Sequence, residues 1–593
     1  MPNREYSGSQ LICAALERLG VKHVFGLPGT QNIELFEGLR ESKLKTVLAT
    51  SELAAGFMAN GYYRASGAPG VFTTISGPGF AFALAPLAEA RQDSAAVLHL
   101  VNAPPEGTQK FRLQALEQRS IISTVARCVA DIGTAEEAPA VIAQAFRCTL
   151  EGEPGPVTVQ YSKKALQATV DGRTAEKLLA DVTVPDVAPN VSVEEIEQFA
   201  AMLRAAKKPA FYVGQGSIAA ARELQALAEA MNAPVITTRS ARGVVPMDHP
   251  LSLAFDFNGT GAVGANAVLK ASDLVVVLGC KLGHNGTAGF RIQFPTDRMV
   301  QVDTSREVLA GNYRARLAIH GNVRTVLVAV MERLGLAQES TSTVGSAKDG
   351  APKSGWTAEE LEKWKPANQR EWGEGPAEPS FPTRPAGLAK GFFDALRAAL
   401  PRDAILVTDS GLHQVVAFRH WQSLAPRGII APSDFQSMGF GLPAAVGAKL
   451  AAPERRVAVL LGDGGMAMSG MELLTAVREQ LELTVIVFND GALGQIRLQQ
   501  FGSYGAGHAT TLQNPDFEML AQAMGVTYIP LEQDARNTLC EAVAAPGVKL
   551  VEVPVGQSRA MRVARAKGLA RQSASKLVGR SAWARLKAKI KRK

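Results

Sequence analysis

Long hydrophobic runs are missing from this 593-residue sequence. No apolar stretch approaches the roughly 18 residues that a membrane-spanning helix needs, and residues 1–20 carry charges where a signal peptide has an unbroken apolar core. We therefore expect a cytoplasmic protein. Cysteines are also few and lack the spacing of metal ligands, so we expect them to be buried apolar side chains; they are Cys13, Cys128, Cys148, Cys280 and Cys540.

Acidic residues are absent from the tail, residues 557–593, which holds thirteen lysines and arginines. The whole chain has a net charge of +8, so the part before the tail carries −5 and does not favour nucleic acid as a partner. Within the tail, Trp583, Leu586 and Ile590 form an apolar stripe on a basic helix, which is typical of contact with anionic membrane surfaces, a partner's groove or nucleic acid. A solvated end and a segment that closes an active site are the alternatives.

Short apolar strands alternate with helix-length segments through most of the chain, as in HVFGLPG, GVFTTISGPG, DLVVVLG and VAVLLGDGG. This alternation predicts α/β domains with parallel, doubly wound sheets. We expect three such domains, over residues 1–170, 188–335 and 386–556, followed by the basic tail. Residues 336–385 are rich in Ser, Pro, Gly and charge, which indicates a linker.

The stretch 457–490 combines a glycine-rich turn with acids at the ends of two strands. Gly464 and Gly465 belong to a turn that lets a phosphate approach backbone N–H groups at a helix N-terminus. The turn lacks the lysine of a P-loop and the spacing GxGxxG, so a bound diphosphate needs another counter-charge. Asp463 and Asp490 offer oxygen ligands for Mg²⁺ or Ca²⁺, which would bridge these acids to the phosphates.

The combination of GDGG with an Asn-Asp pair about two dozen residues later resembles the signature of thiamin-diphosphate (ThDP) enzymes. Residues 1 to about 556 look like the acetolactate synthase and 2-oxo-acid decarboxylase branch of that family. The resemblance implies a pyrimidine-binding domain, a central domain and a diphosphate-binding domain, in that order. It also implies that Mg²⁺ is held by Asp463, Asp490 and the carbonyl of Ala492.

ThDP needs a carboxyl group beside its aminopyrimidine ring before it can react. The segment LATSELAAGFMANGYYRASG matches the family pattern around this acid and supplies Glu52, which opens a helix of small residues. The resemblance therefore implies that Glu52 is catalytic. An ordinary first-turn acid that stabilises a helix N-terminus is the alternative.

Further roles are implied by the same resemblance. Met438 in SMGFGLPAA matches the residue that wedges between the two rings of ThDP, and Gln114 in FRLQALEQ aligns with a glutamine beside the reacting centre. A core methionine and a surface glutamine are the alternatives. The full set of implied cofactor-binding residues is Pro78, Gly411, His413, Met438, Gly464, Gly465, Leu493 and Gly494.

The chain also departs from the acetolactate synthase pattern. Ser51 stands where many synthases have His, Phe82 where they have Asn, and Gln499 where many have a Trp that selects 2-oxobutyrate. These differences put biosynthetic acetohydroxyacid synthase activity in doubt. Matches to the flavin-binding part of the central domain are poor, so FAD stays an alternative without support.

The implied reaction removes CO₂ from a 2-oxo acid and joins the remaining carbons to a second carbonyl compound. Release of an aldehyde is the alternative, and the segment PGTQN also resembles decarboxylases of guanidino-2-oxo acids, where Gln31 and Asn32 would meet the far end of the substrate or merely cap a helix. A third hypothesis is an inactive ThDP-binding scaffold, against which the joint presence of Glu52, Asp463 and Asp490 speaks. The family arrangement implies a homodimer or homotetramer.

Overall fold

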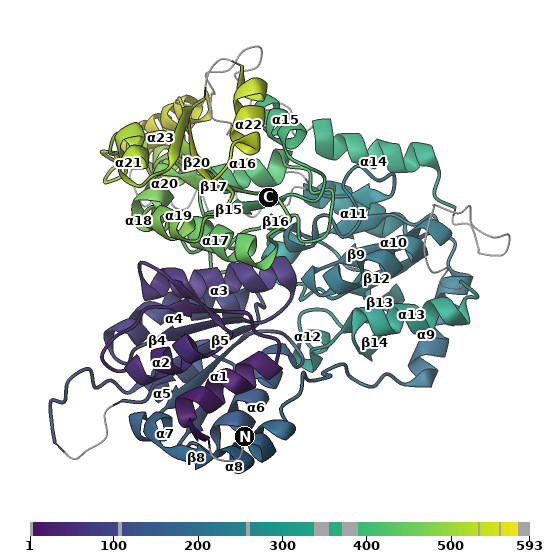
Figure 1. Cartoon of the computed structure of the whole chain (residues 1–593). Helices are drawn as coiled ribbons and strands as arrows, with labels where there is room; N and C mark the ends of the chain where they lie inside the picture. Colours follow the sequence, from purple (N-terminus) through teal and green to yellow (C-terminus); the bar gives the residue numbers. More distant parts are fainter. Residues whose placement is uncertain are drawn as a thin grey trace.

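The computed structural model contains three six-stranded parallel sheets covered by helices, and a small two-stranded sheet beside the first of them (Figure 1). This agrees with the α/β fold and the three parallel-sheet domains expected from the sequence. None of the described helices is long and apolar enough to cross a membrane. The structure describes residues 4–104, 109–255, 261–336, 355–370, 389–531, 534–556 and 559–578.

The N-terminal domain has the strand order β3-β2-β4-β5-β7-β6. Its strands are β2 (His23–Gly26), β3 (Lys45–Leu48), β4 (Gly70–Thr74), β5 (Val97–Asn102), β6 (Cys128–Ile132) and β7 (Pro156–Tyr161), and β1 (Glu5–Ser7) pairs separately with β8 (Thr169–Asp171). Its helices are α1 (Gly8–Arg18), α2 (Ile33–Glu41), α3 (Glu52–Ser66), α4 (Pro78–Gln92), α5 (Gln118–Val125), α6 (Ala138–Leu150), α7 (Lys163–Gln167) and α8 (Gly172–Ala180).

The central domain has the strand order β11-β10-β9-β12-β13-β14. Its strands are β9 (Pro209–Val213), β10 (Val235–Thr237), β11 (Ser252–Leu253), β12 (Leu274–Leu278), β13 (Met299–Asp303) and β14 (Leu317–His320). Its helices are α9 (Val193–Ala205), α10 (Ala221–Ala230), α11 (Gly261–Ala271), α12 (Arg306–Leu309) and α13 (Val323–Arg333).

The C-terminal domain has the strand order β16-β15-β17-β18-β20-β19. Its strands are β15 (Ile405–Thr408), β16 (Ile429–Ile430), β17 (Val457–Gly462), β18 (Leu483–Asn489), β19 (Thr527–Pro530) and β20 (Val548–Pro554). Its helices are α15 (Ala389–Ala399), α16 (Leu412–His420), α17 (Gly441–Ala451), α18 (Asp463–Ser469), α19 (Glu472–Arg478), α20 (Gly494–Tyr504), α21 (Phe517–Ala523) and α22 (Ala535–Ala544).

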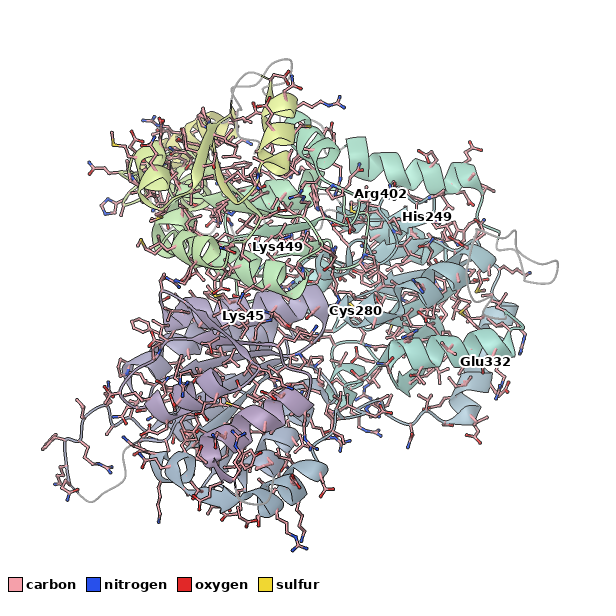
Figure 2. The ribbon with its side chains drawn as sticks, viewed as in Figure 1. Lys45, His249, Cys280, Glu332, Arg402 and Lys449 are labelled. Atoms are coloured by element: carbon pink, nitrogen blue, oxygen red, sulfur yellow. The ribbon has the colours of Figure 1, made fainter. Side chains whose placement is uncertain are left out.

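Helices α3 and α17 join the N-terminal and C-terminal domains and lie side by side between the two sheets (Figure 1). Glycines allow this approach, because a Cβ atom on Gly61 would overlap the backbone of Ala444 and one on Gly447 would overlap the backbone of Met58. Apolar residues of both domains form one continuous core around this contact. Ion pairs add to the domain contacts, among them Lys45–Glu479 at 2.6 Å; Lys45 is labelled in Figure 2.

Part of the expected linker is folded. Trp356 is 3% exposed, and its indole N–H donates to the carbonyl of Pro209 at 2.8 Å. Helix α14 (Ala358–Arg370) follows and packs beside α11 of the central domain (Figure 1). The sequence of α14 is rich in charge and poor in apolar residues, so its pattern does not predict a helix. The buried side chain of Trp356, just before α14, anchors this segment to the central domain.

The start of the basic tail forms helix α23 (Arg559–Val578), which packs against α20. Gly568 meets Gly505 and the carbonyl of Phe501 so closely that neither glycine has room for a side chain. This part of the tail is therefore not a solvated coil. The apolar stripe of Trp583, Leu586 and Ile590 lies outside the described residues.

The cysteines follow the expectation only in part. Cys13 and Cys280 are buried, and Cys128 and Cys148 are half-buried. Cys540 is exposed, because it lies on the outer face of α22 away from the core residues Leu539 and Ala542. Within the described ranges, no three His, Cys, Asp or Glu side chains are grouped as a metal cluster.

Candidate functional site

Two carboxyl groups meet at the carboxyl edge of the C-terminal sheet. Strand β17 ends at Gly462 and is followed by Asp463, and the neighbouring parallel strand β18 ends at Asn489 and is followed by Asp490. Asp463 is the first residue of α18 and is 2% exposed. Because the carboxyl ends of parallel strands meet at one edge, the sheet brings together two acids that are 27 residues apart in sequence.

Asp463 is oriented by contacts with two loops. Its Oδ2 accepts hydrogen bonds from the backbone N–H of Ala492 at 3.1 Å and from Asn514 Nδ2 at 2.7 Å. Asn514 Nδ2 also donates to Asn489 Oδ1 at 2.8 Å, so one amide group links both strand ends. Sequence reasoning missed Asn514, because a single asparagine in a loop carries no pattern.

The surroundings of Asp490 favour a bound cation. Burial, with the charge of Asp463 as the next cause, raises the pKa of Asp490 to about 6. The two carboxyl groups supply hard oxygen donors, which suit Mg²⁺. A cation between them would offset the repulsion, so the residues present fit the ion that the resemblance implies.

The glycine turn is closely packed beside these acids. A Cβ atom on Gly464 would lie 2.9 Å from Leu493 Cδ2 and 3.3 Å from Met438 Cε. A Cβ atom on Gly494 would lie 2.5 Å from Asp490 Oδ2. Met438 and Leu493 therefore meet at Gly464, next to Asp463, and Gly494 lies against Asp490.

The adjacent loop after β15 contributes Gly411 and His413. His413 is buried, which lowers its pKa to about 4 and keeps the imidazole neutral. Its ring lies beside both Gly411 and Gly462, where side chains would collide with it. In the described part of the chain its buried Nε2 has no hydrogen-bond partner, so a ligand would satisfy it.

Asp409 is a second residue that sequence reasoning missed. It is fully buried, and burial raises its pKa to about 7. Its carboxyl accepts hydrogen bonds from the N–H groups of Ser410 at 2.6 Å and Gly439 at 2.9 Å. It therefore holds the turn that follows Met438. In the sequence, Asp409 is a single acid in the segment TDSG, and nothing in that segment predicts this role.

On the N-terminal domain, Glu52 is the first residue of α3, and its carboxyl is half-buried. Ser51 caps the helix, with its Oγ accepting from the N–H of Ala54 at 3.2 Å. Glu52 Oε1 lies 2.8 Å from the position of a Cβ atom on Gly79, so the carboxyl sits against the start of α4, next to Pro78. Two helix N-termini therefore meet at this carboxyl group.

Two glutamines lie near this point, and only one was expected. Gln114 is half-buried, has a left-handed backbone with φ of 56°, and touches the turn at Gly77. Gln118, which sequence reasoning missed, is fully buried. Its Oε1 accepts from the N–H of Gly77 at 3.0 Å and its Nε2 donates to the carbonyl of Asn102 at 3.2 Å, so it holds the turn before Pro78 in place.

The residues Gln31 and Asn32 have different surroundings. Asn32 is fully buried, accepts from the N–H of Gly29 at 2.7 Å and donates to the carbonyl of Leu27 at 3.1 Å. Its amide is thus used within its own loop at the start of α2. Gln31 is half-buried.

The candidate site residues fall into two groups at opposite ends of α3 and α17. The pairs Met58–Gly447 and Gly61–Ala444 show that these helices run antiparallel. Glu52 therefore lies near the end of α17, while Met438 lies just before its start. At 1.5 Å per residue, eleven residues of α17 separate the two groups by roughly 16 Å along the helix.

A cavity of about 420 Å³ lies where the three domains meet, beyond the carboxyl ends of β9, β10, β12 and β13. It is lined by Gly214, Gly279, Asp303 and Cys280, the last of which is labelled in Figure 2. This is the switch point of the central sheet, where open α/β sheets bind ligands. Two stretches match the flavin-binding part of the central domain poorly. Most of LGCKLGHNG, residues 278–286, lines this cavity. Most of AFDFNGTG, residues 254–261, lies outside the described residues.

Three family models match the chain. They describe the N-terminal TPP binding domain, the central domain and the C-terminal TPP binding domain of thiamine pyrophosphate enzymes, over residues 6–124, 196–330 and 409–553. Among similar proteins, the acetolactate synthase isozyme 1 large subunit of Escherichia coli is 30% identical over 93% of this chain and 94% of its own. A probable 2-ketoarginine decarboxylase of Pseudomonas aeruginosa is 31% identical over the same shares. A probable acetolactate synthase large subunit of Methanocaldococcus jannaschii is 29% identical over 93% of both chains.

Proposed function

Because this chain belongs to the thiamine pyrophosphate enzymes, we propose that it decarboxylates a 2-oxo acid and joins the remaining carbons to a second carbonyl compound, with ThDP held through Mg²⁺. The observation that carries this proposal is the pair Asp463 and Asp490 at the ends of neighbouring strands, beside the turn at Gly464. The pair offers a cation two carboxyl groups, and Met438 and Leu493 line the turn with apolar side chains. The relatives that are acetolactate synthases support the joining step.

The C-terminal domain would hold the diphosphate end of the cofactor. Asp463, Asp490 and the carbonyl of Ala492 would bind Mg²⁺, while the N–H groups at the start of α18 would face the phosphates. Within the described residues, His413 Nε2 is buried and has no hydrogen-bond partner, so a polar group of the bound cofactor would satisfy it. Met438 and Leu493 would pack against the rings.

The N-terminal domain would supply the proton-holding group. When bound, ThDP supplies a ring carbon that attacks the ketone and holds the electron pair left by CO₂. Glu52 would hold a proton at its carboxyl toward the aminopyrimidine, in the role of a general acid–base group. The Glu52 carboxyl lies against the start of α4, at Gly79.

The separation of the two groups supports a homodimer, with each site formed from the N-terminal domain of one copy and the C-terminal domain of the other. Large apolar side chains are exposed on both halves, as expected for a surface that a second copy covers. They include Ile33 and Phe82 on the N-terminal domain, and Met468, Met471 and Ile496 on the C-terminal domain. A tetramer would be a pair of such dimers.

Simple decarboxylation to an aldehyde is the second candidate, favoured by the match to a probable 2-ketoarginine decarboxylase. Asn32 gives it no support, because its amide is used within its own loop. Gln499, which stands where many acetolactate synthases have a tryptophan, favours neither the joining reaction nor simple decarboxylation.

A panel of 2-oxo acids tests the proposal. CO₂ release from the holoenzyme, with product analysis by mass spectrometry, would show a 2-hydroxy-ketone for the joining reaction and an aldehyde for simple decarboxylation. No CO₂ from any member of a panel that includes pyruvate, 2-oxobutyrate, 2-oxoglutarate and 2-oxo-5-guanidinovalerate would contradict both and favour the scaffold.

A further inference from the structure

Helix α4 carries a buried carboxyl group that has no part in the proposed reaction. Glu89 lies three turns beyond Pro78 and is fully buried. Its Oε2 accepts a hydrogen bond from the backbone N–H of Ser437 at 2.9 Å. The contact joins residues 348 positions apart and reaches the segment that leads to Met438.

The same segment is held at several further points by α3 and α4. Asp93, one turn beyond Glu89, accepts from the N–H of Ser433 at 3.1 Å and of Asp434 at 3.1 Å. Arg64 pairs with Asp93 at 3.0 Å and also donates to the carbonyl of Ala431. The backbone from residue 431 to 437 is thus fixed to the N-terminal domain by side chains.

Met438 consequently stands between two anchored amides. The N–H before it, of Ser437, donates to Glu89, and the N–H after it, of Gly439, donates to Asp409 at 2.9 Å. Both acceptors are buried carboxyl groups on different domains. A backbone anchored on both sides restricts where the Met438 side chain can point.

We propose that Glu89 is a positioning residue, whose carboxyl holds the N–H of Ser437 so that Met438 keeps its place against Gly464 and Leu493. The role of Met438 toward the cofactor rests on the proposed function, whereas the anchoring itself does not. Glu89 acts through the backbone of Ser437, the residue before Met438.

The charge state of Glu89 fits this role. Burial, with the charge of Asp93 as the next cause, raises its pKa to about 8, so it is a neutral acid at pH 7. The charged groups around it are Asp93 on the same helix, Arg64 on α3, which offsets Asp93, and Asp434 in the anchored segment. A neutral carboxyl group accepts the hydrogen bond from the Ser437 N–H without adding a second buried charge beside Asp93. A glutamine side chain offers the same kind of acceptor.

Amide hydrogen exchange of the protein without cofactor tests the anchoring directly. Glu89→Met removes the acceptor at similar length and should speed exchange in the peptide containing residues 433–438 by about tenfold, the effect of one lost buried hydrogen bond. Glu89→Gln should leave it unchanged. Leu87→Val, which trims a fully buried side chain on the same helix, controls for general destabilisation.

Equal exchange in Glu89→Met and the unaltered protein would overturn the proposal, as would an equal rise in Leu87→Val. With cofactor and a turned-over 2-oxo acid, Glu89→Met should lower kcat about tenfold and Glu89→Gln should restore it at pH 7. Turnover that survives Glu89→Met despite faster exchange would overturn the link to Met438. If no 2-oxo acid reacts, the proposed function fails, and the exchange experiment still decides the anchoring.

Discussion

The N-terminal and C-terminal sheets share one strand order, with the third and fourth strands side by side, but these strands end in different chemistry. In the C-terminal sheet, β17 and β18 lead to Asp463 and Asp490. In the N-terminal sheet, β4 leads to Ser76 and β5 ends at Asn102. The side-chain oxygen of Asn102 accepts a hydrogen bond from the N–H of Ser76 at 2.8 Å. One edge offers a cation two carboxylates, and the other offers it none.

The comparison teaches that the topology selects the place of a site and the side chains select its ligand. At the N-terminal edge, neutral amides of Asn102 and Gln118 fix a turn, and Glu52 at the start of α3 supplies an acid. This edge suits a neutral ring that exchanges a proton. The C-terminal edge suits a diphosphate with its metal ion, so the two edges should fail in different ways when altered.

The largest expected effect comes from Glu52→Gln. It keeps the size of the side chain and removes its acid, so turnover should fall by about 10² to 10⁴-fold. ThDP and Mg²⁺ should still bind, because the C-terminal edge is untouched; calorimetric titration with the cofactor checks this. Turnover close to that of the unaltered enzyme would remove Glu52 from the account.

Asp490→Ala should weaken binding of the metal ion and the cofactor rather than the chemical step. The Mg²⁺ concentration needed for half-maximal activity should rise at least about tenfold, because one of two carboxylate ligands is lost. Activity should recover in part at high Mg²⁺ and ThDP. An unchanged Mg²⁺ requirement with low turnover would mean that the two edges do not divide their tasks as described.

The contact between the two domains gives a smaller effect, on stability. Gly61→Ala places a methyl group against the backbone of Ala444, which should cost about 1–3 kcal/mol and lower the thermal unfolding midpoint. Gly502→Ala is the matched control, since a Cβ atom there meets nothing within 4 Å and alanine favours the helix α20. If Gly61→Ala melts no lower than Gly502→Ala, α3 and α17 are not packed as described.

The last expected effect depends on pH. The folded protein holds the proton of Glu89 up to about pH 8, well above the ordinary pKa of a glutamate, so this group lowers folding stability as pH rises from about 4.5 to 8. Glu89→Gln removes the titration. Its melting temperature relative to the unaltered protein should therefore rise across that window and level off above it. A difference in melting temperature that stays constant across this pH range would contradict the raised pKa of Glu89.

Local patterns in the sequence revealed much of the fold and one edge of the candidate site. Asp463 and Asp490 each follow an apolar strand, so periodicity alone placed them at strand ends. Asn514, Asp409 and Glu89 could not be found in this way, because their roles depend on contacts with Asp463, Gly439 and Ser437, which lie 51, 30 and 348 positions away. The helix α14 was missed for a related reason, since its place depends on a tertiary contact of Trp356.

The account rests on sites shared between two chains, and mixing two inactive variants tests this most directly. Glu52→Gln and Asp463→Ala should each be nearly inactive alone, since each lacks one half of every site. After subunit exchange in equal amounts, half of the dimers hold one chain of each kind and one intact site of two, so about a quarter of the unaltered activity should return. No recovery, with exchange shown by mass spectrometry of the intact dimers, would mean that Glu52 and Asp463 serve the same chain, and the division between the two domains would be wrong.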